Sequence, residues 1–128
     1  MDHTVLVCDN EEPLRALIVA ALAPLRCRVE QAADGDQALE RIRSTAPDLV
    51  LLDMMMPGKT GLEVLAEVRR DSALCDVPVV MLTARTQVAD QEAFAAAGAD
   101  CYVAKPFSPA KLLLVVEDLL ANGRRRAA

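Results

Sequence analysis

The sequence has few aromatic residues: no tryptophan, one tyrosine and two phenylalanines among 128 residues. Single-stranded nucleic acids are usually bound by stacking bases on aromatic rings, so this composition argues against such a surface. The net charge of −5 likewise argues against general nucleic-acid binding by the body of the chain. Hydrophobic residues still make up 53%, so aliphatic side chains must build the core of a chain whose length fits one domain.

The sequence also lacks the patterns of metal-binding, secreted and membrane-spanning proteins. Its four cysteines show no CxxC or CxxH spacing, so no zinc site is predicted at Cys8, Cys27, Cys75 and Cys101. The first residues contain no apolar segment typical of a secretory signal, and no apolar run reaches about 18 residues. We therefore expect a cytoplasmic protein that makes no contact with a membrane.

Short apolar runs alternate with segments of helical periodicity along the whole chain. The apolar runs predict strands at residues 4–8, 27–31, 48–53, 77–82 and 101–104. The helical segments run from Pro13 through Leu25 and over residues 35–44, 62–70, 87–97 and 109–120. This alternation predicts an α/β fold with a doubly wound, five-stranded parallel sheet. We expect a single domain over residues 1–122, and a basic tail or the start of a linker over residues 123–128.

Polar residues stand where four of the predicted strands end, and ligands bind outside the carboxyl ends of strands in such sheets. They are Asp9 with Asn10, then Asp53, Thr83 and Lys105. An aspartate can form an acyl phosphate, and Mg²⁺ prefers oxygen ligands. A lysine and a threonine can each hold a phosphate oxygen. Each residue alone is an ordinary turn or cap residue, so their convergence is what predicts a phosphoryl-transfer site.

At these residues the sequence resembles the response-regulator receiver domain of two-component signalling, a CheY-like family. The matching stretches are residues 5–11, 47–58 with Gly61, 79–84 and 98–107, within a resemblance that runs from about Thr4 to Asn122. The resemblance implies the flavodoxin-like (βα)5 fold. It also implies a phosphoprotein switched by Mg²⁺-dependent phosphorylation, with a histidine kinase or phosphotransfer protein as donor. Such a domain is a signalling switch and not an enzyme, apart from self-catalysed phosphoryl transfer and hydrolysis.

The resemblance assigns roles to individual positions. Asp53 matches the phosphoacceptor, and Thr83 and Lys105 match the two residues that act on the phosphoryl group. Tyr102 matches the aromatic switch residue that moves inward as Thr83 shifts. The bond preceding Pro106 is expected to be cis, a geometry found almost only before proline.

The same resemblance implies a Mg²⁺ site made of Asp9, Asn10, Asp53 and the backbone carbonyl of Met55. Asn10 departs from the family pattern, which has a second acid there. Its amide oxygen can coordinate Mg²⁺ but brings no charge, so we expect weaker Mg²⁺ binding than in a pocket with two adjacent acids. Glu11 is expected to cap the following helix, with compensation for Asn10 as the alternative.

Two further positions, Met55 and Arg85, lie where the family tunes hydrolysis of the acyl phosphate. Because Met55 cannot orient an attacking water, we expect a fairly long-lived phosphorylated state.

The last predicted helix carries more apolar residues than one buried stripe needs. Leu113 and Leu114 are therefore expected to be partly exposed beside Tyr102. The family uses the fourth helix, fifth strand and fifth helix for homodimers and output partners. The alternative is ordinary scattered leucine on the surface.

Two other classes of function compete with a phosphoacceptor switch. A pseudo-receiver would keep the fold and bind partners without phosphorylation, and Asn10 is the feature that favours it. Enzymes of similar fold are disfavoured. A flavin-binding flavodoxin needs a Ser/Thr/Gly-rich phosphate loop after the first strand, and this chain has Asp9-Asn10-Glu11-Glu12 there. An aspartate-nucleophile phosphatase carries Asp-x-Asp there, whereas this chain has Asp9-Asn10-Glu11.

Overall fold

The structure is a computed structural model, and it describes residues 3–123 of the chain. Within that range, five parallel strands form one sheet in the order β2-β1-β3-β4-β5. The strands are β1 (Thr4–Cys8), β2 (Arg28–Ala32), β3 (Leu49–Asp53), β4 (Val79–Thr83) and β5 (Cys101–Ala104). The helices are α1 (Glu12–Leu22), α2 (Gly35–Thr45), α3 (Gly61–Arg70), α4 (Val88–Ala97) and α5 (Pro109–Asn122). The predicted α/β architecture is therefore confirmed.

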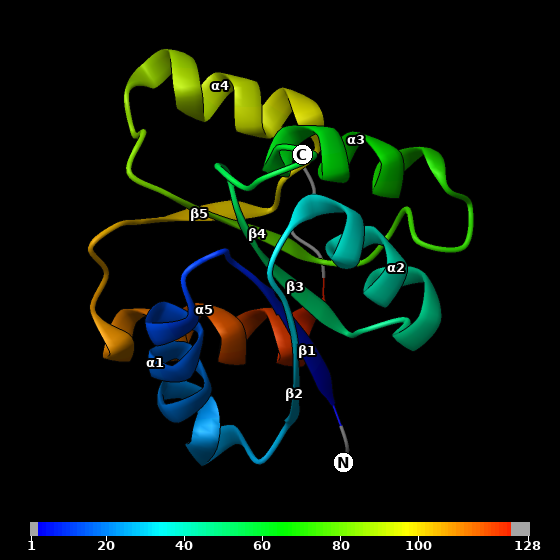
Figure 1. Cartoon of the computed structure of the whole chain (residues 1–128). Helices are drawn as coiled ribbons and strands as arrows, with labels where there is room; N and C mark the ends of the chain where they lie inside the picture. The colour runs from blue at the N-terminus through cyan, green and yellow to red at the C-terminus, as the bar shows by residue number, and fades with distance from the viewer. Residues whose placement is uncertain (1–2, 124–128) are drawn as a thin grey trace.

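Helices cover both faces of the sheet (Figure 1). Helices α1 and α5 lie on one face, and α2, α3 and α4 lie on the other. Successive side chains of a strand point to opposite faces, so Val5 and Val7 pack under α1 and α5 while Leu6 and Cys8 pack under the other three helices. Because both faces are buried, the central strands are continuous apolar runs and not alternating ones.

Proline accounts for two of the predicted boundaries that are wrong. Helix α1 ends at Leu22, and a 3₁₀ turn over Ala23–Leu25 replaces the expected last turn, since Pro24 lacks an N–H for the helical ladder. Arg26 then adopts the left-handed region with φ of 54°, so β2 begins at Arg28 and not at Cys27. Pro78 similarly has no N–H to give a neighbouring strand, and β4 begins after it.

Arg69 of α3 secures the end of the sheet where β4 begins. Its side chain is 12% exposed and pairs with Asp100 at 3.1 Å, and the same Asp100 oxygen accepts the Val79 N–H at 2.8 Å. The guanidinium also donates to the carbonyl of Gly98 at 2.9 Å. Gly98 ends α4 with φ of 96°, the left-handed cap that the sequence predicted.

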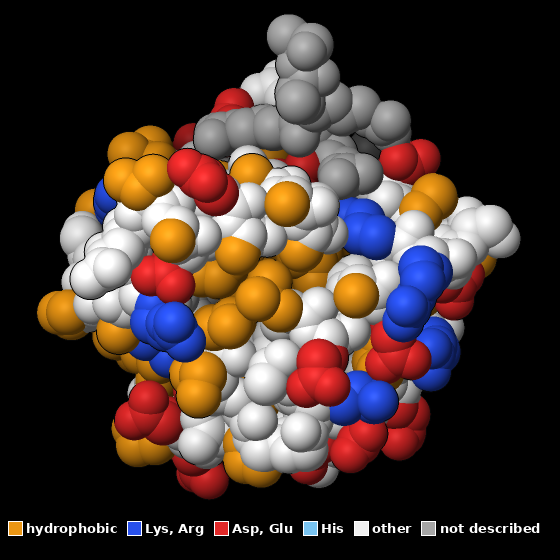
Figure 2. Space-filling model, turned by 90° about the horizontal axis from the view of Figure 1, so that it is seen from above, with side chains coloured by type: hydrophobic (Ala, Val, Ile, Leu, Met, Phe, Trp, Pro, Cys, Tyr) orange, Lys and Arg blue, Asp and Glu red, His pale blue; other side chains and the backbone are white. Residues whose placement is uncertain are grey.

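The surface carries exposed apolar side chains on several elements. Figure 2 looks onto the side where α3 and α4 lie in Figure 1, and apolar side chains gather in the middle of that face among charged ones. On α5, Leu114 is 65% exposed, whereas Leu113 is half-buried against the core under α1 and α5. Tyr102 packs against the core on the opposite side of the sheet. No helix in the described range is long and apolar enough to cross a membrane.

Candidate functional site

The polar residues that follow the strands meet at one edge of the sheet. Asp53 is the last residue of β3, and Asp9 comes directly after β1, the strand paired with it. The strand order reverses between β1 and β3, which is where ligands bind in doubly wound sheets. Among the described residues, the buried polar or charged ones are Asp9, Asp53 and Thr83. Burying two carboxylates side by side is costly unless a cation or hydrogen bonds compensate them.

Backbone hydrogen bonds hold the ends of β3, β4 and β5 in register. The Met54 N–H donates to the carbonyl of Leu82 at 3.0 Å, and the Lys105 N–H donates to the carbonyl of Thr83 at 2.7 Å. These bonds place Asp53, Thr83 and Lys105 in a row along the carboxyl edge.

Helix α3 begins close against the same edge because its first residue is glycine. The Gly61 N–H donates to the carbonyl of Met54 at 2.9 Å. A Cβ at Gly61 would lie 2.4 Å from the carbonyl oxygen of Asp53, a distance at which the backbone must move. Only glycine allows this approach, and the loop after Asp53 is thereby held tightly against the sheet.

Lys105 bridges the two carboxylates. Its Nζ lies 2.9 Å from Oδ2 of Asp9 and 3.2 Å from Oδ1 of Asp53. Asp9 also accepts the Glu11 N–H at 2.8 Å through its other oxygen, and Asp53 accepts the Met55 N–H at 3.2 Å. One ammonium therefore serves two buried carboxylates, and the pair retains excess negative charge.

The pKa values of the site follow from this imbalance. Burial raises the pKa of Asp53 above its ordinary value, and the charge of Asp9 raises it further, against the opposing effects of the Met55 N–H and Lys105. Burial alone would lower the pKa of Lys105, but its hydrogen bond to Asp9 and the charges of Asp53 and Asp9 raise it overall. A positive charge beside Asp53 would stabilise its ionised form, and would thereby offset both the cost of burial and the repulsion from Asp9.

These donors fit a hard divalent cation such as Mg²⁺. Two carboxylates with one ammonium give net negative charge, and oxygen ligands are those that Mg²⁺ prefers. Among the described residues, no three His, Cys, Asp or Glu side chains gather as a ready metal cluster. The cation would thus rest on Asp9 and Asp53, with the amide of Asn10, the backbone carbonyl of Met55 and water as further oxygen donors. Asn10 is exposed, and the Met55 side chain also faces solvent.

The two proposed switch residues have other partners in this structure. The Thr83 hydroxyl accepts the Arg85 N–H at 2.8 Å and lies 3.4 Å from the Arg85 carbonyl. Tyr102 is half-buried, with its ring centroid 6.2 Å from that of Phe94. The peptide bond between Lys105 and Pro106 is cis.

Arg15 supports the site and was missed from the sequence. Its Nη1 donates to the carbonyl of Asp9 at 2.6 Å, and its Nε donates to Oε1 of Gln31 at 3.0 Å. Its contact with Gln31 depends on β2 lying beside β1, so no local spacing in the sequence could indicate that partner. One expectation is also wrong: Glu11 is the N-cap of α1, but its side chain makes no capping hydrogen bond.

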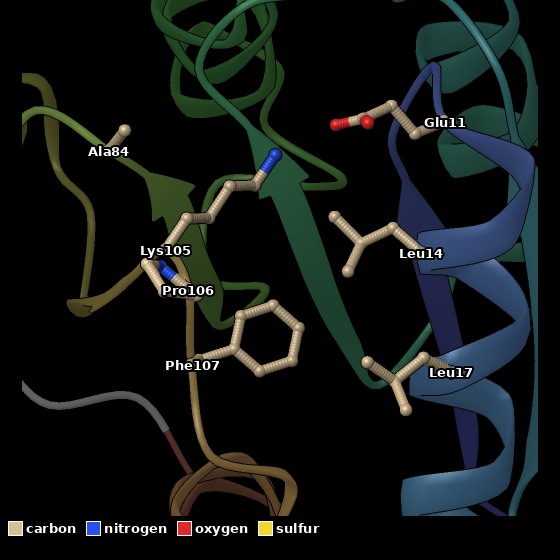
Figure 3. Close-up of a pocket in the computed structure, with 7 residues that line it drawn as sticks. All are labelled: Glu11, Leu14, Leu17, Ala84, Lys105, Pro106 and Phe107. Atoms are coloured by element: carbon tan, nitrogen blue, oxygen red, sulfur yellow. The ribbon is translucent and has the colours of Figure 1, made fainter.

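A largely apolar hollow of about 380 Å³ adjoins the site (Figure 3). Leu14 and Leu17 of α1 face Phe107 across it, and the side chains of Lys105 and Glu11 reach over the end of β3. The hollow therefore lies between α1 and the segment that follows β5, and Lys105 links it to Asp53.

Comparison with known proteins identifies similar sequences. A family model described as the response regulator receiver domain matches residues 5–117. The phosphate regulon transcriptional regulatory protein PhoB of Escherichia coli is 36% identical over 120 residues, which are 94% of this chain and 52% of PhoB. The probable transcriptional regulator ycf27 of Cyanophora paradoxa is 41% identical over 116 residues, 91% of this chain and 47% of that protein. The chain thus spans about half the length of the curated relatives it matches.

Solved structures show the same fold over their full length. A putative response regulator from Chloroflexus aurantiacus superposes with a TM-score of 0.89 at 32% identity, covering 95% of this chain and 100% of that one. The chemotaxis response regulator CheY4 of Vibrio cholerae superposes with a TM-score of 0.87 at 31% identity, covering 93% of this chain and 99% of that one.

Proposed function

The chain belongs to the response regulator receiver domain family, and from this premise we propose that it is switched by Mg²⁺-dependent phosphorylation of Asp53. The observation that carries the proposal is Asp53, a residue that is only 4% exposed, with its carboxylate at the strand-order reversal beside Asp9 and Lys105. A buried carboxylate whose pKa is raised, as that of Asp53 is, and that shares an ammonium with a second acid is typical of a functional site. The donor is a histidine kinase or a phosphotransfer protein of the cytoplasm.

In the proposed reaction an oxygen of Asp53 attacks the phosphorus of the donor. The bond between phosphorus and the donor's histidine nitrogen breaks, and the nitrogen keeps the bonding electron pair. The product is an acyl phosphate on Asp53, which water later hydrolyses to phosphate and the free carboxylate. When bound, Mg²⁺ offsets the repulsion between the carboxylate and the phosphoryl oxygens.

Lys105 and Thr83 act on the phosphoryl group in this proposal. The Lys105 ammonium, already 3.2 Å from Asp53, holds a phosphoryl oxygen by a charge-assisted hydrogen bond. The Thr83 hydroxyl leaves its two contacts with Arg85 and donates to another oxygen. Tyr102 then moves inward, which shifts the population of a two-state surface on α4, β5 and α5.

We further propose two partner surfaces. The hollow between α1 and Phe107 receives the phosphodonor, because its apolar lining is continuous with Lys105 and hence with the phosphorylation site. The surface of α4, β5 and α5, which includes the exposed Leu114, serves a homodimer or an output partner. The receiver domain extends over residues 1–122. Of the proposed tail or linker at 123–128, residues 124–128 lie outside the described residues.

Intact-mass spectrometry after incubation with acetyl phosphate and Mg²⁺ tests the phosphorylation. The wild type should gain one phosphoryl group, and neither Asp53→Ala nor the wild type without Mg²⁺ should gain it. Absence of an adduct with several small phosphodonors at high Mg²⁺ would favour the binding module without phosphorylation, with Asn10 as the disabling change.

A further inference from the structure

Glu11 carries a carboxylate that the fold leaves unused. An N-cap side chain ordinarily accepts a hydrogen bond from the first turn of its helix, and that of Glu11 does not. Its backbone N–H instead donates to Oδ1 of Asp9 at 2.8 Å. Within the described residues no hydrogen bond or ion pair occupies its carboxylate. The backbone of Glu11 is therefore held next to Asp9, and its carboxylate is available to interact with a ligand.

That carboxylate faces the phosphorylation site. Glu11 lines the same hollow as Lys105, and Figure 3 shows its carboxylate pointing across the end of β3 toward the Lys105 side chain. Lys105 in turn contacts both Asp9 and Asp53. The next residue, Glu12, has the same charge and is also exposed, but it does not line the hollow. Position, and not charge alone, therefore distinguishes Glu11.

The charges around Asp53 indicate what the Glu11 carboxylate can contribute. Asp9 and Asp53 carry two negative charges and Lys105 one positive charge, so the pocket holds a net charge of one negative unit. Asn10 adds none, whereas an acid at its position would make the pocket more attractive to a divalent cation. Glu11 is the acidic residue along the wall of the hollow that can restore this charge.

We propose that the Glu11 carboxylate supplies the charge that Asn10 lacks, by accepting a hydrogen bond from a water bound to Mg²⁺. Contact through water suits the site because Mg²⁺ keeps several waters when one or two carboxylates bind it. It also agrees with the absence of a three-carboxylate cluster among the described residues. This inference rests on the proposed function, since it concerns the same site.

The test measures Mg²⁺ affinity of the unphosphorylated protein by isothermal titration calorimetry. Wild type is compared with Glu11→Gln and with the matched control Glu12→Gln, which removes the same charge one residue further along α1. Glu11→Gln should raise the dissociation constant roughly three- to tenfold, as for one partly screened charge acting on a divalent ion. Glu12→Gln should raise it less than about twofold, because Glu12 is exposed and does not line the hollow, so solvent and salt screen its charge.

Equal changes in the two variants, or no change in either, overturn the inference. Acetyl-phosphate labelling separates that failure from failure of the proposed function. A wild type that gains the phosphoryl group on Asp53, with Mg²⁺ affinity that does not depend on Glu11, refutes only the role of Glu11. A wild type that neither binds Mg²⁺ nor gains the adduct refutes both. Circular dichroism of each variant checks that the fold is retained.

Discussion

Replacing Lys105 by methionine tests the electrostatic description of the site. The substitution removes an ammonium that lies 2.9 Å from Asp9 and 3.2 Å from Asp53, while it keeps most of the apolar stem. The two carboxylates remain buried, and each keeps a backbone N–H, from Glu11 and Met55 respectively. The variant should fold but should be less stable at neutral pH.

The expected loss is intermediate between that of a surface pair and that of a buried one. Removing one partner of a fully buried ion pair costs about 3–5 kcal/mol. The Lys105 side chain is 19% exposed, so water already screens part of the interaction. We expect the free energy of unfolding to fall by about 2–3 kcal/mol, which lowers the urea midpoint by roughly 1–2 M. Lys111→Met, a change at an exposed lysine of α5, should stay within about 0.5 kcal/mol of the wild type.

The loss should depend on pH in a defined direction. The folded-state pKa of Lys105 is raised, so its stabilisation is fully present below the ordinary lysine value of 10.5 and therefore at pH 7. In Lys105→Met the pKa of Asp53, already raised, rises further. A carboxyl with a higher pKa in the folded state binds more protons there, so stability increases as pH falls toward the ordinary aspartate value of 3.8. The deficit relative to wild type should thus be smaller at pH 5 than at pH 7.

Urea unfolding followed by circular dichroism at both pH values measures this deficit. An unchanged m-value is required for the comparison to report stability alone. A variant as stable as the wild type at pH 7, or a deficit equal at the two pH values, would refute the assignment of Lys105 as the counter-charge of the buried carboxylates.

Three further predictions concern a core leucine, the close approach of Gly61 and the ion pair of Arg69. Leu112→Ala should lower the free energy of unfolding by about 2–4 kcal/mol, because Leu112 is fully buried. Leu114→Ala, on the exposed side of α5, should lower it by less than about 0.5 kcal/mol in the same urea assay. Gly61→Ala should lower the thermal midpoint and slow the labelling of Asp53 by acetyl phosphate, since the new Cβ displaces the end of β3. Unchanged labelling would contradict the close contact between Gly61 and the backbone of Asp53. Arg69→Met should lower the free energy of unfolding by about 2–4 kcal/mol. At a temperature where the variant is folded, the final extent of Asp53 labelling should be unchanged, because the contacts of Arg69 lie at the other end of the sheet. Reduced labelling would show that the two ends are coupled.

The sequence predicted the strands well wherever burial alone determined them. Up to Asp53, the buried positions of β1 and β3 are all apolar because helices cover both faces of the sheet. This pattern can be recognised without knowing which strands are neighbours. The errors came where a single residue changed the backbone. Pro24 ended α1 early, and Pro78 shortened β4, although the apolar pattern continues through both places.

The candidate site was predicted as a set of strand-end residues, and the structure brings Asp9, Asp53, Thr83 and Lys105 to one edge. The interactions among them were not predictable in the same way. Thr83 uses its hydroxyl on Arg85 and Glu11 leaves its carboxylate free of the helix cap, and both facts depend on loop geometry. Hydrogen-bond partners are chosen by distance in space, which local periodicity does not encode.

By itself, then, the sequence determined which segments form strands and helices and which polar residues stand at strand ends. The reason is that burial and backbone chemistry act within a few residues. The tertiary structure alone decided that Lys105 meets Asp9 across 96 positions of sequence, and that Arg15 of α1 donates to Gln31 of β2 as well as to the nearby carbonyl of Asp9. Such contacts follow from the strand order β2-β1-β3-β4-β5, which results from packing of the whole sheet.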